Sequence, residues 1–181
     1  NKMLDRVAIL DAPENVENID QLKVVATGKA KKPADGDAAG AGGGDKGGMR
    51  PPTQDKGFGS YYFPWLKVSD PLSPKNEINV PPSGHMAGIY ARTDATRGVH
   101  KAPANEVVRG ALDLTYRITP QEQGDLNTNG VNCIRFFPTQ GIRVWGARTL
   151  AEAANEWRYV NVRRLFNMIE ESISRGTRWV V

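Results

Sequence analysis

Cysteine and histidine are scarce in this chain of 181 residues. It carries one cysteine, Cys133, and two histidines, His85 and His100. A single cysteine excludes an internal disulfide framework, and these three residues cannot supply a four-ligand cysteine/histidine zinc site. The sequence therefore predicts a domain held together by an ordinary core rather than by disulfides or zinc.

Long apolar runs and a strong charge of one sign are also missing. No stretch approaches the roughly 18 apolar residues of a transmembrane helix. Lys and Arg number 24 against 20 Asp and Glu, which leaves a formal charge of only +4. The apolar content of 39% is enough for one core, and the length fits one domain. We expect a soluble, cytosol-compatible domain with no signal segment at its front.

Residues 27–57 lack aromatic, Val, Leu and Ile side chains and hold nine of the 19 glycines. Such a segment cannot bury enough apolar surface to offset its ordering entropy. It predicts a flexible surface insertion rich in Gly, Ala, Lys and Asp. Within it, residues 42–47 formally match a dinucleotide-binding glycine pattern, but no strand precedes it and no helix follows, so nucleotide binding is not expected.

Strand and helix patterns alternate along the rest of the chain. Residues 7–10 predict a strand buried on both faces, and a short helix follows over 15–25. Ser83 is the predicted N-cap of a helix that ends at Gly98. Residues 131–137 and 142–145 predict two strands joined by a tight turn. The pattern predicts an α/β domain with a mixed sheet and flanking helices.

A second long helix is predicted over residues 161–175, capped by Asn161 and ended by Gly176. Its apolar side chains repeat on one face, with charged side chains outside. A strand is then predicted over 177–181. The residues of the apolar face are Val162, Leu165, Phe166, Ile169 and Ile173.

Particular residues also suggest two other functions, hydrolysis and nucleic-acid binding. Asp11 ends a strand and Ser83 opens a helix much as the aspartate and serine of subtilisin-type proteases do, yet neither His85 nor His100 has the context of a catalytic histidine. A divergent hydrolase therefore stays an alternative. Arginines interleaved with Trp and Tyr near the end leave nucleic-acid binding as another, although acidic residues alternate with them.

Several blocks together resemble the contractile tail sheath protein family. The most telling are GIRVWGARTL at 141–150, WRYVNVRRLF at 157–166 and PPSGHMAGIYARTD at 81–94. They stand in the order typical of the family, as do residues 4–11, 61–68, 97–105 and 170–173. The insertion at 27–57 departs from the family pattern.

The resemblance implies a subtilisin-like sheath core domain without catalytic residues. It implies a structural protein, without cofactor, whose copies assemble as stacked hexameric rings around an inner tube and contract to drive the tube through a target envelope. The implied partners are other copies, the inner tube protein, and baseplate and terminator or cap proteins, with no nucleic acid or membrane. Assembly in the bacterial cytoplasm is expected, followed by residence in a phage tail or a released or cell-bound particle.

In such sheaths, extended N- and C-terminal arms link neighbouring subunits by adding strands to the next copy. We expect residues 1–181 to be one core domain fragment without these arms, able to fold but not to polymerise efficiently. Mixed Arg and Glu surfaces can re-pair at modest cost when a lattice rearranges. The expected subunit-interface residues are Arg158, Arg163, Arg164, Glu170, Glu171 and Arg175; the alternative is that this helix packs inside the domain with its charges in solvent.

Overall fold

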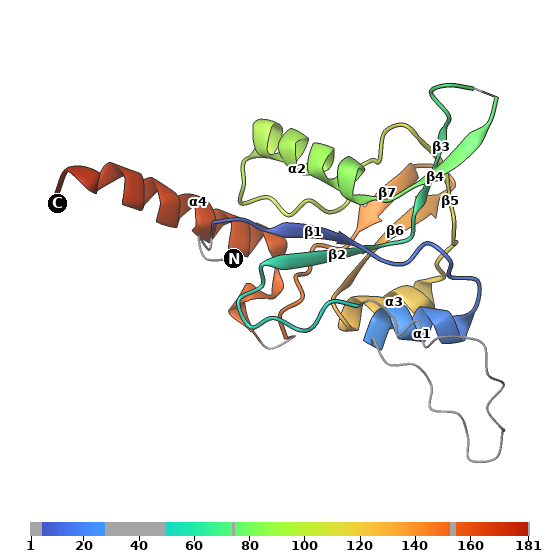
Figure 1. Ribbon diagram of the computed structural model, residues 1–181, viewed down its shortest axis with the longest axis horizontal. Helices are drawn as coiled ribbons and strands as arrows, with labels where there is room; N and C mark the ends of the chain where they lie inside the picture. The colour runs from blue at the N-terminus through green and yellow to red at the C-terminus, as the bar shows by residue number, and fades with distance from the viewer. Residues whose placement is uncertain (1–4, 28–49, 74, 153–154, 181) are drawn as a thin grey trace, which may run out of the picture.

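The computed structural model describes residues 5–27, 50–73, 75–152 and 155–180. Its centre is a four-stranded sheet in the order β1-β2-β6-β7 (Figure 1). Strands β1 (Ala8–Asp11), β2 (Gly59–Phe63) and β6 (Val131–Phe137) are parallel, and β7 (Gly141–Trp145) is antiparallel to β6. The predicted mixed sheet and the strand, turn and strand over 131–145 are confirmed.

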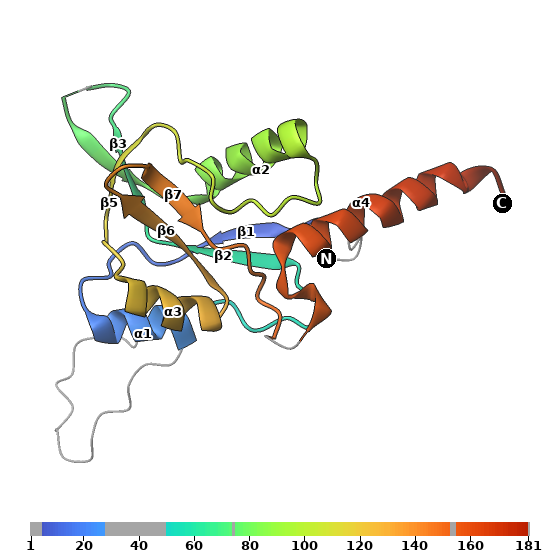
Figure 2. The same cartoon turned by 180° about the vertical axis from the view of Figure 1, so that it is seen from behind.

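Helices cover both faces of this sheet, as the views from either side show (Figures 1 and 2). Helices α1 (Ile19–Thr27) and α3 (Pro120–Thr128) lie on one face, and α2 (Ser83–Arg97) lies on the other. Side chains alternate along a strand, so Tyr61 and Phe63 enter the core under α1 and α3 while Tyr62 enters the core under α2. The predicted flanking helices are confirmed.

A small antiparallel sheet extends the α2 side of the core. Its order is β4-β3-β5, with β3 at Leu66–Ser69, β4 at Glu77–Val80 and β5 at Ala111–Leu114. Leu66 and Leu114 are paired in register and both belong to the core beneath α2.

The N-terminal elements differ from prediction in their ends and burial. Helix α1 begins at Ile19 and ends at Thr27 rather than spanning 15–25. Strand β1 was expected to be buried on both faces, but its residues are half-buried or exposed. The reason is its place at one end of the described strand order, where β2 is its only strand neighbour.

The start of α2 is capped by a residue distant in the sequence. Ser83 is the first helical residue rather than the N-cap, a place taken by Pro82. The Ser83 backbone N–H donates to Asp11 Oδ1 at 2.7 Å, which puts a carboxylate at the positive end of the helix. Gly98 ends α2 as predicted, with a φ of 90°.

The last long helix, α4, spans Val160–Gly176. Tyr159 stands at its N-cap in place of Asn161, and Gly176 is still helical, with Thr177 as the C-cap. The predicted strand over 177–181 is wrong for its described part, because Arg178–Val180 forms a 3-10 turn. Among the described helices, none combines the length and apolar character that crossing a membrane would need.

The predicted insertion at 27–57 is longer than the structure supports at both ends. Thr27 belongs to α1. Gln54 N–H donates to the Leu150 carbonyl at 3.0 Å, and Asn155 Nδ2 donates to the Asp55 carbonyl at 2.6 Å, so residues near 54–57 are attached to the domain. Residues 28–49, the rest of the predicted insertion, lie outside the described residues.

Candidate assembly surface on helix α4

Helix α4 leads away from the sheet (Figure 1). Much of its apolar face is exposed. Phe166, Ile169 and Ile173 are exposed, and 59% of Ile173 is accessible. Met168 on the same helix is also exposed, and Trp179 just beyond it is 83% exposed. The alternative, that this helix packs inside the domain, does not hold for the outer half of α4. An exposed apolar stripe of this kind marks an interaction surface.

Arg163 anchors the inner half of α4 and is buried, with only 4% of the residue exposed. Its Cζ lies 4.1 Å from the ring centroid of Trp157 and 4.8 Å from that of Phe58. Its Nε donates to Asn167 Oδ1 at 2.7 Å, and its Nη2 donates to both carboxylate oxygens of Glu170. Arg163 thus binds α4 to the domain and is inaccessible to a second copy in this structure.

A close backbone approach places the aromatic partners of Arg163. Gly57 has a φ of 63°, and a Cβ at this position would lie 2.5 Å from the Trp157 carbonyl oxygen. The missing side chain lets the segment leading to Phe58 pass directly beside Trp157. Trp157 also meets Phe166 edge to face, with centroids 5.1 Å apart. Sequence reasoning missed this cluster because Gly57 and Phe58 lie about 100 residues before Trp157 and Arg163, and no spacing in the sequence links the two segments.

Arg164 ties α4 to α2. Both of its terminal nitrogens bind the carboxylate of Asp94, with Nη1 at 3.0 Å from Oδ1 and Nη2 against Oδ2. Its Cζ lies 4.6 Å from the ring centroid of Tyr90. Burial raises the pKa of Tyr90, against the opposing effects of hydrogen bonds to Ser60 and Tyr62 and of the nearby Arg164 charge. Arg164 is therefore also engaged inside the chain.

The other expected interface residues point to solvent. Glu170 is 54% exposed although it accepts from Arg163. Glu171 Oε1 accepts from Arg175 Nε at 2.6 Å, one helical turn on, and the Arg175 side chain is exposed. Arg158 is exposed, with its Cζ 5.0 Å from the Tyr159 ring centroid. All four of these side chains are at least partly exposed.

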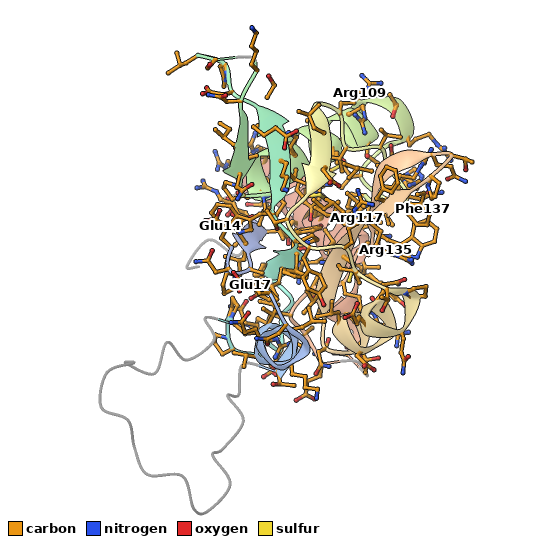
Figure 3. All side chains as sticks on the ribbon, turned by 90° about the vertical axis from the view of Figure 1, so that its right-hand side faces the viewer. Glu14, Glu17, Arg109, Arg117, Arg135 and Phe137 are labelled. Atoms are coloured by element: carbon orange, nitrogen blue, oxygen red, sulfur yellow. The ribbon has the colours of Figure 1, made fainter. Side chains whose placement is uncertain are left out.

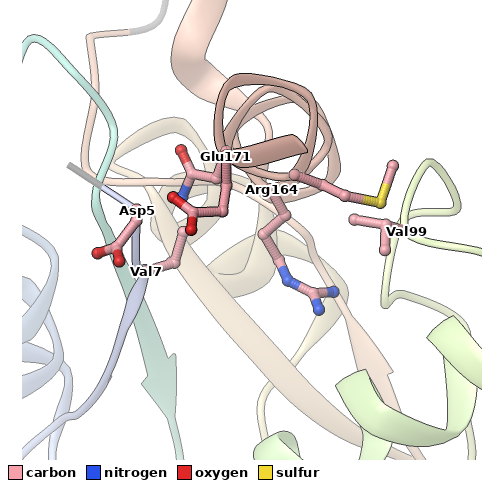
Figure 4. A pocket seen from close by; sticks show the side chains of 7 residues that line it. Asp5, Val7, Val99, Arg164 and Glu171 are labelled. Atoms are coloured by element: carbon pink, nitrogen blue, oxygen red, sulfur yellow. The ribbon is translucent and has the colours of Figure 1, made fainter. Parts of the chain in front are cut away.

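A hollow lies at the base of α4, between the segment leading into β1 and the loop after α2 (Figure 4). Arg164 and the carboxylates of Asp5 and Glu171 border it, and Val7 and Val99 supply apolar walls. Within the described ranges, no group of three or more His, Cys, Asp or Glu side chains is placed to hold a metal ion. The walls of the hollow combine positively and negatively charged side chains with apolar ones.

Asp11 and Ser83, two of the residues considered for hydrolysis, form a helix cap. Asp11 approaches Ser83 through the backbone N–H and not through the hydroxyl. His85 borders a shallow groove with Ser83, and His100 contributes its backbone carbonyl to Asn161 Nδ2 at 3.0 Å. Among the described residues, no imidazole hydrogen bond links these residues into a triad, so the geometry gives the hydrolase alternative no support.

Comparison with known proteins gives one consistent answer. Residues 1–150 match the family described as "Phage tail sheath protein central domain". A prophage major tail sheath protein of Pseudomonas aeruginosa is 31% identical over 106 residues, covering 56% of this chain and 27% of that protein. The tail sheath protein of Enterobacteria phage T4 is 29% identical over 109 residues, covering 58% of this chain and 16% of that protein.

Solved structures extend the match to nearly the whole chain. The sheath complex of an extracellular contractile injection system, PVC, in its contracted state is 36% identical with a TM-score of 0.73, covering 96% of this chain and 41% of that one. The helical sheath of the anti-feeding prophage in its contracted state is 32% identical with a TM-score of 0.63, covering 96% and 47%. The chain spans less than half the length of these relatives. It belongs to the phage tail sheath protein family.

Proposed function

We propose that this chain is a structural part of a contractile sheath subunit. Copies assemble as stacked hexameric rings around an inner tube, and contraction of the rings drives the tube through a target cell envelope. The observation that carries the proposal is the uncovered apolar stripe of α4 on a fold shared with contracted sheath structures. Monomeric soluble domains rarely expose a continuous apolar stripe of this kind on a projecting helix.

The α4 surface supplies contacts to a second copy in this proposal. The stripe formed by Phe166, Ile169 and Ile173 contributes apolar area. The exposed side chains of Arg158, Glu170, Glu171 and Arg175 contribute charges elsewhere on this surface, and these charges change partners when the lattice contracts. Exposed ion pairs are each worth only about 0–1 kcal/mol, so exchanging them is inexpensive. Arg163 and Arg164 act indirectly, by fixing the direction of α4 relative to the domain.

The role is mechanical and involves no cofactor or bond-breaking step. Its support is that the similar proteins are sheath proteins and that Asp11 and Ser83 form a helix cap. The partners are further copies, an inner tube protein, and baseplate and terminator or cap proteins, without nucleic acid or membrane. The baseplate is supported by similarity to a chain of the anti-feeding prophage baseplate, at 32% identity and a TM-score of 0.70. Assembly takes place in the bacterial cytoplasm, and the product is a phage tail or an extracellular contractile particle.

A chimera tests this function. Residues 5–180 replace the matching segment of the PVC sheath subunit, and the product is expressed with its tube and imaged by negative-stain electron microscopy. We expect cross-striated sheaths of extended and contracted length. Folded chimeric subunits that stay single particles beside tubes, while the parent PVC subunit assembles in parallel, would contradict the proposal.

A further inference from the structure

Arginine and phenylalanine side chains are stacked in pairs near the turn of the β6–β7 hairpin. This group, here called the hairpin patch, comprises Arg117 and Phe136, which are exposed, and Arg135 and Phe137, which are half-buried. Arg117 Cζ lies 5.2 Å from the Phe136 ring centroid, and Arg135 Cζ lies 5.2 Å from the Phe137 centroid. Phe136 is 40% exposed. Arginine and aromatic residues are enriched where proteins bind one another. The patch thus has the composition of an interface.

The positive charge of the hairpin patch is poorly compensated within the chain. Arg135 donates to the neutral Gln123 Oε1 at 2.8 Å and forms no ion pair among the described residues. Among the described residues Arg117 pairs only with Asp113, at 3.2 Å, and its side chain is 66% exposed. A stacked guanidinium keeps N–H donors on its edge, which can bind a carboxylate. The patch is suited to an acidic protein surface.

An acidic counterpart lies on the other side of the same face. Glu14 and Glu17, the acidic patch, stand opposite Arg117, Arg135 and Phe137 when the molecule is viewed from this side (Figure 3). Glu14 Oε1 accepts only from Asn79 Nδ2, at 2.9 Å, and Glu17 is exposed. Neither glutamate forms an ion pair with the rest of the described chain. The two patches are opposite in charge and lie apart in this view (Figure 3).

We propose that the hairpin patch of one copy binds the acidic patch of a second copy, head to tail. This rests on the proposed function, which brings copies side by side. A contact between two different patches leaves one free patch on each copy, so the contact repeats along a ring or helix. The stacked phenylalanines add apolar area, while the exposed charges make the contact sensitive to salt.

Single-stranded nucleic acid is the competing occupant for an arginine and aromatic surface. One observation favours the second copy: Glu14 and Glu17 form no ion pair within the described part of the chain, so their carboxylates can bind the patch. Binding of a single-stranded oligonucleotide is therefore measured as an alternative outcome and is not part of the proposal.

Disulfide trapping tests the contact, because the native Cys133 is buried and burial raises its thiol pKa to about 12. Chains with Asn15→Cys, beside the acidic patch, are mixed with chains with Thr139→Cys, in the hairpin turn, and oxidised. We expect the 15–139 disulfide to exceed the 15–15 and 139–139 products by about fivefold in low salt, and to lose that excess in 0.5 M salt. A statistical mixture of the three products at low salt would overturn the proposal.

Charge exchange makes the test specific. Glu14→Lys with Glu17→Lys on one chain, or Arg117→Glu with Arg135→Glu on the other, should abolish the excess, and combining the reversed chains should restore it. Lys56→Glu, an exposed reversal outside both patches, is the matched control and should change nothing. If circular dichroism shows that the reversed chains are folded and their combination still does not restore the excess of the 15–139 disulfide, the proposal is wrong.

Two further readouts separate the possible failures. If a labelled oligothymidine binds the wild-type chain, and Arg117→Glu with Arg135→Glu removes that binding while cross-links stay statistical, nucleic acid occupies the patch and the proposal is wrong. If the PVC chimera forms sheaths but the cross-links are statistical, the sheath function stands and this contact does not. A specific 15–139 disulfide without chimeric sheaths would support the contact and count against the proposed function.

Discussion

Arg164 binds both carboxylate oxygens of Asp94 while its guanidinium lies over the ring of Tyr90. This relationship joins α4 to α2, two helices separated in the sequence by β5, α3 and the β6–β7 hairpin. The Arg164 and Asp94 side chains are only 17% and 27% exposed, so water screens the pair weakly. The direction in which α4 leaves the domain depends on this contact and on the burial of Arg163.

Breaking the pair from either side should destabilise the domain. Arg164→Lys and Asp94→Asn each leave a half-buried partner with fewer hydrogen bonds, and each should lower the free energy of unfolding by about 1–3 kcal/mol. Urea denaturation measures this, and the double variant should cost less than the sum of the two single changes. Arg175→Lys, in an exposed pair, is the control. Strict additivity would show that the two residues do not interact.

Replacement of Arg163 should be the most damaging arginine substitution in α4. Arg163→Met keeps part of the packing between Trp157 and Phe58 but loses the cation–π contacts and the bond to Asn167. We expect a loss of about 2–4 kcal/mol in unfolding free energy, against less than about 0.5 kcal/mol for Arg175→Met. Equal effects of the two changes would contradict the anchoring role.

These contacts also alter how an interface on α4 should be tested. Charge reversal at Arg163 and Arg164 would damage the fold before it could report on assembly, because both residues are engaged inside the chain. The informative positions are the exposed ones, and Glu170, Glu171 and Arg175 remain predicted interface residues.

The sequence predicted those parts of the fold that repeat locally. The apolar strands around 131–145 and the periodic face of α4 could be found because side chains on one face recur at fixed spacing. Periodicity does not say what covers a face, so the exposure of Ile173 and the burial of Arg163 could not be predicted. The cap from Asp11 to Ser83 was missed because it joins residues 72 positions apart.

Substitutions on the α4 stripe should separate folding from assembly. Ile169→Ser with Ile173→Ser removes exposed apolar area, so the unfolding free energy of the chain should change by less than about 0.5 kcal/mol per site. The same pair in the PVC chimera should abolish sheaths in electron micrographs. Ser172→Ala, an exposed change between them, is the matched control. If the double variant formed normal sheaths, the stripe would not be part of the interface between copies.

Tyr61 should make stability depend on alkaline pH. Burial raises its pKa from 10.0 to about 12, so the folded chain holds the phenol proton to higher pH than the unfolded chain. Its contribution to stability is intact below pH 10 and is lost as pH rises towards 12, by roughly 2–3 kcal/mol. Tyr61→Phe should therefore flatten the decline in unfolding free energy between pH 9 and 11.5.

The same variant should not cost stability at neutral pH. The Tyr61 hydroxyl is buried and has no hydrogen-bond partner among the described residues, so removing it should be neutral or raise the unfolding free energy by about 1 kcal/mol. Exposed Tyr159→Phe is the control. A loss of more than 1 kcal/mol at pH 7 would show that the hydroxyl is hydrogen bonded after all.

The most direct measurement is maleimide labelling of Ile173→Cys in the PVC chimera, before and after sheath assembly, with buried Cys133 as the unreactive background. Our account predicts rapid labelling of the free subunit and at least tenfold slower labelling in the assembled sheath. Rapid labelling in both states would contradict a contact between copies on α4. Slow labelling in both states would also contradict it, by showing that the stripe is covered within a single subunit.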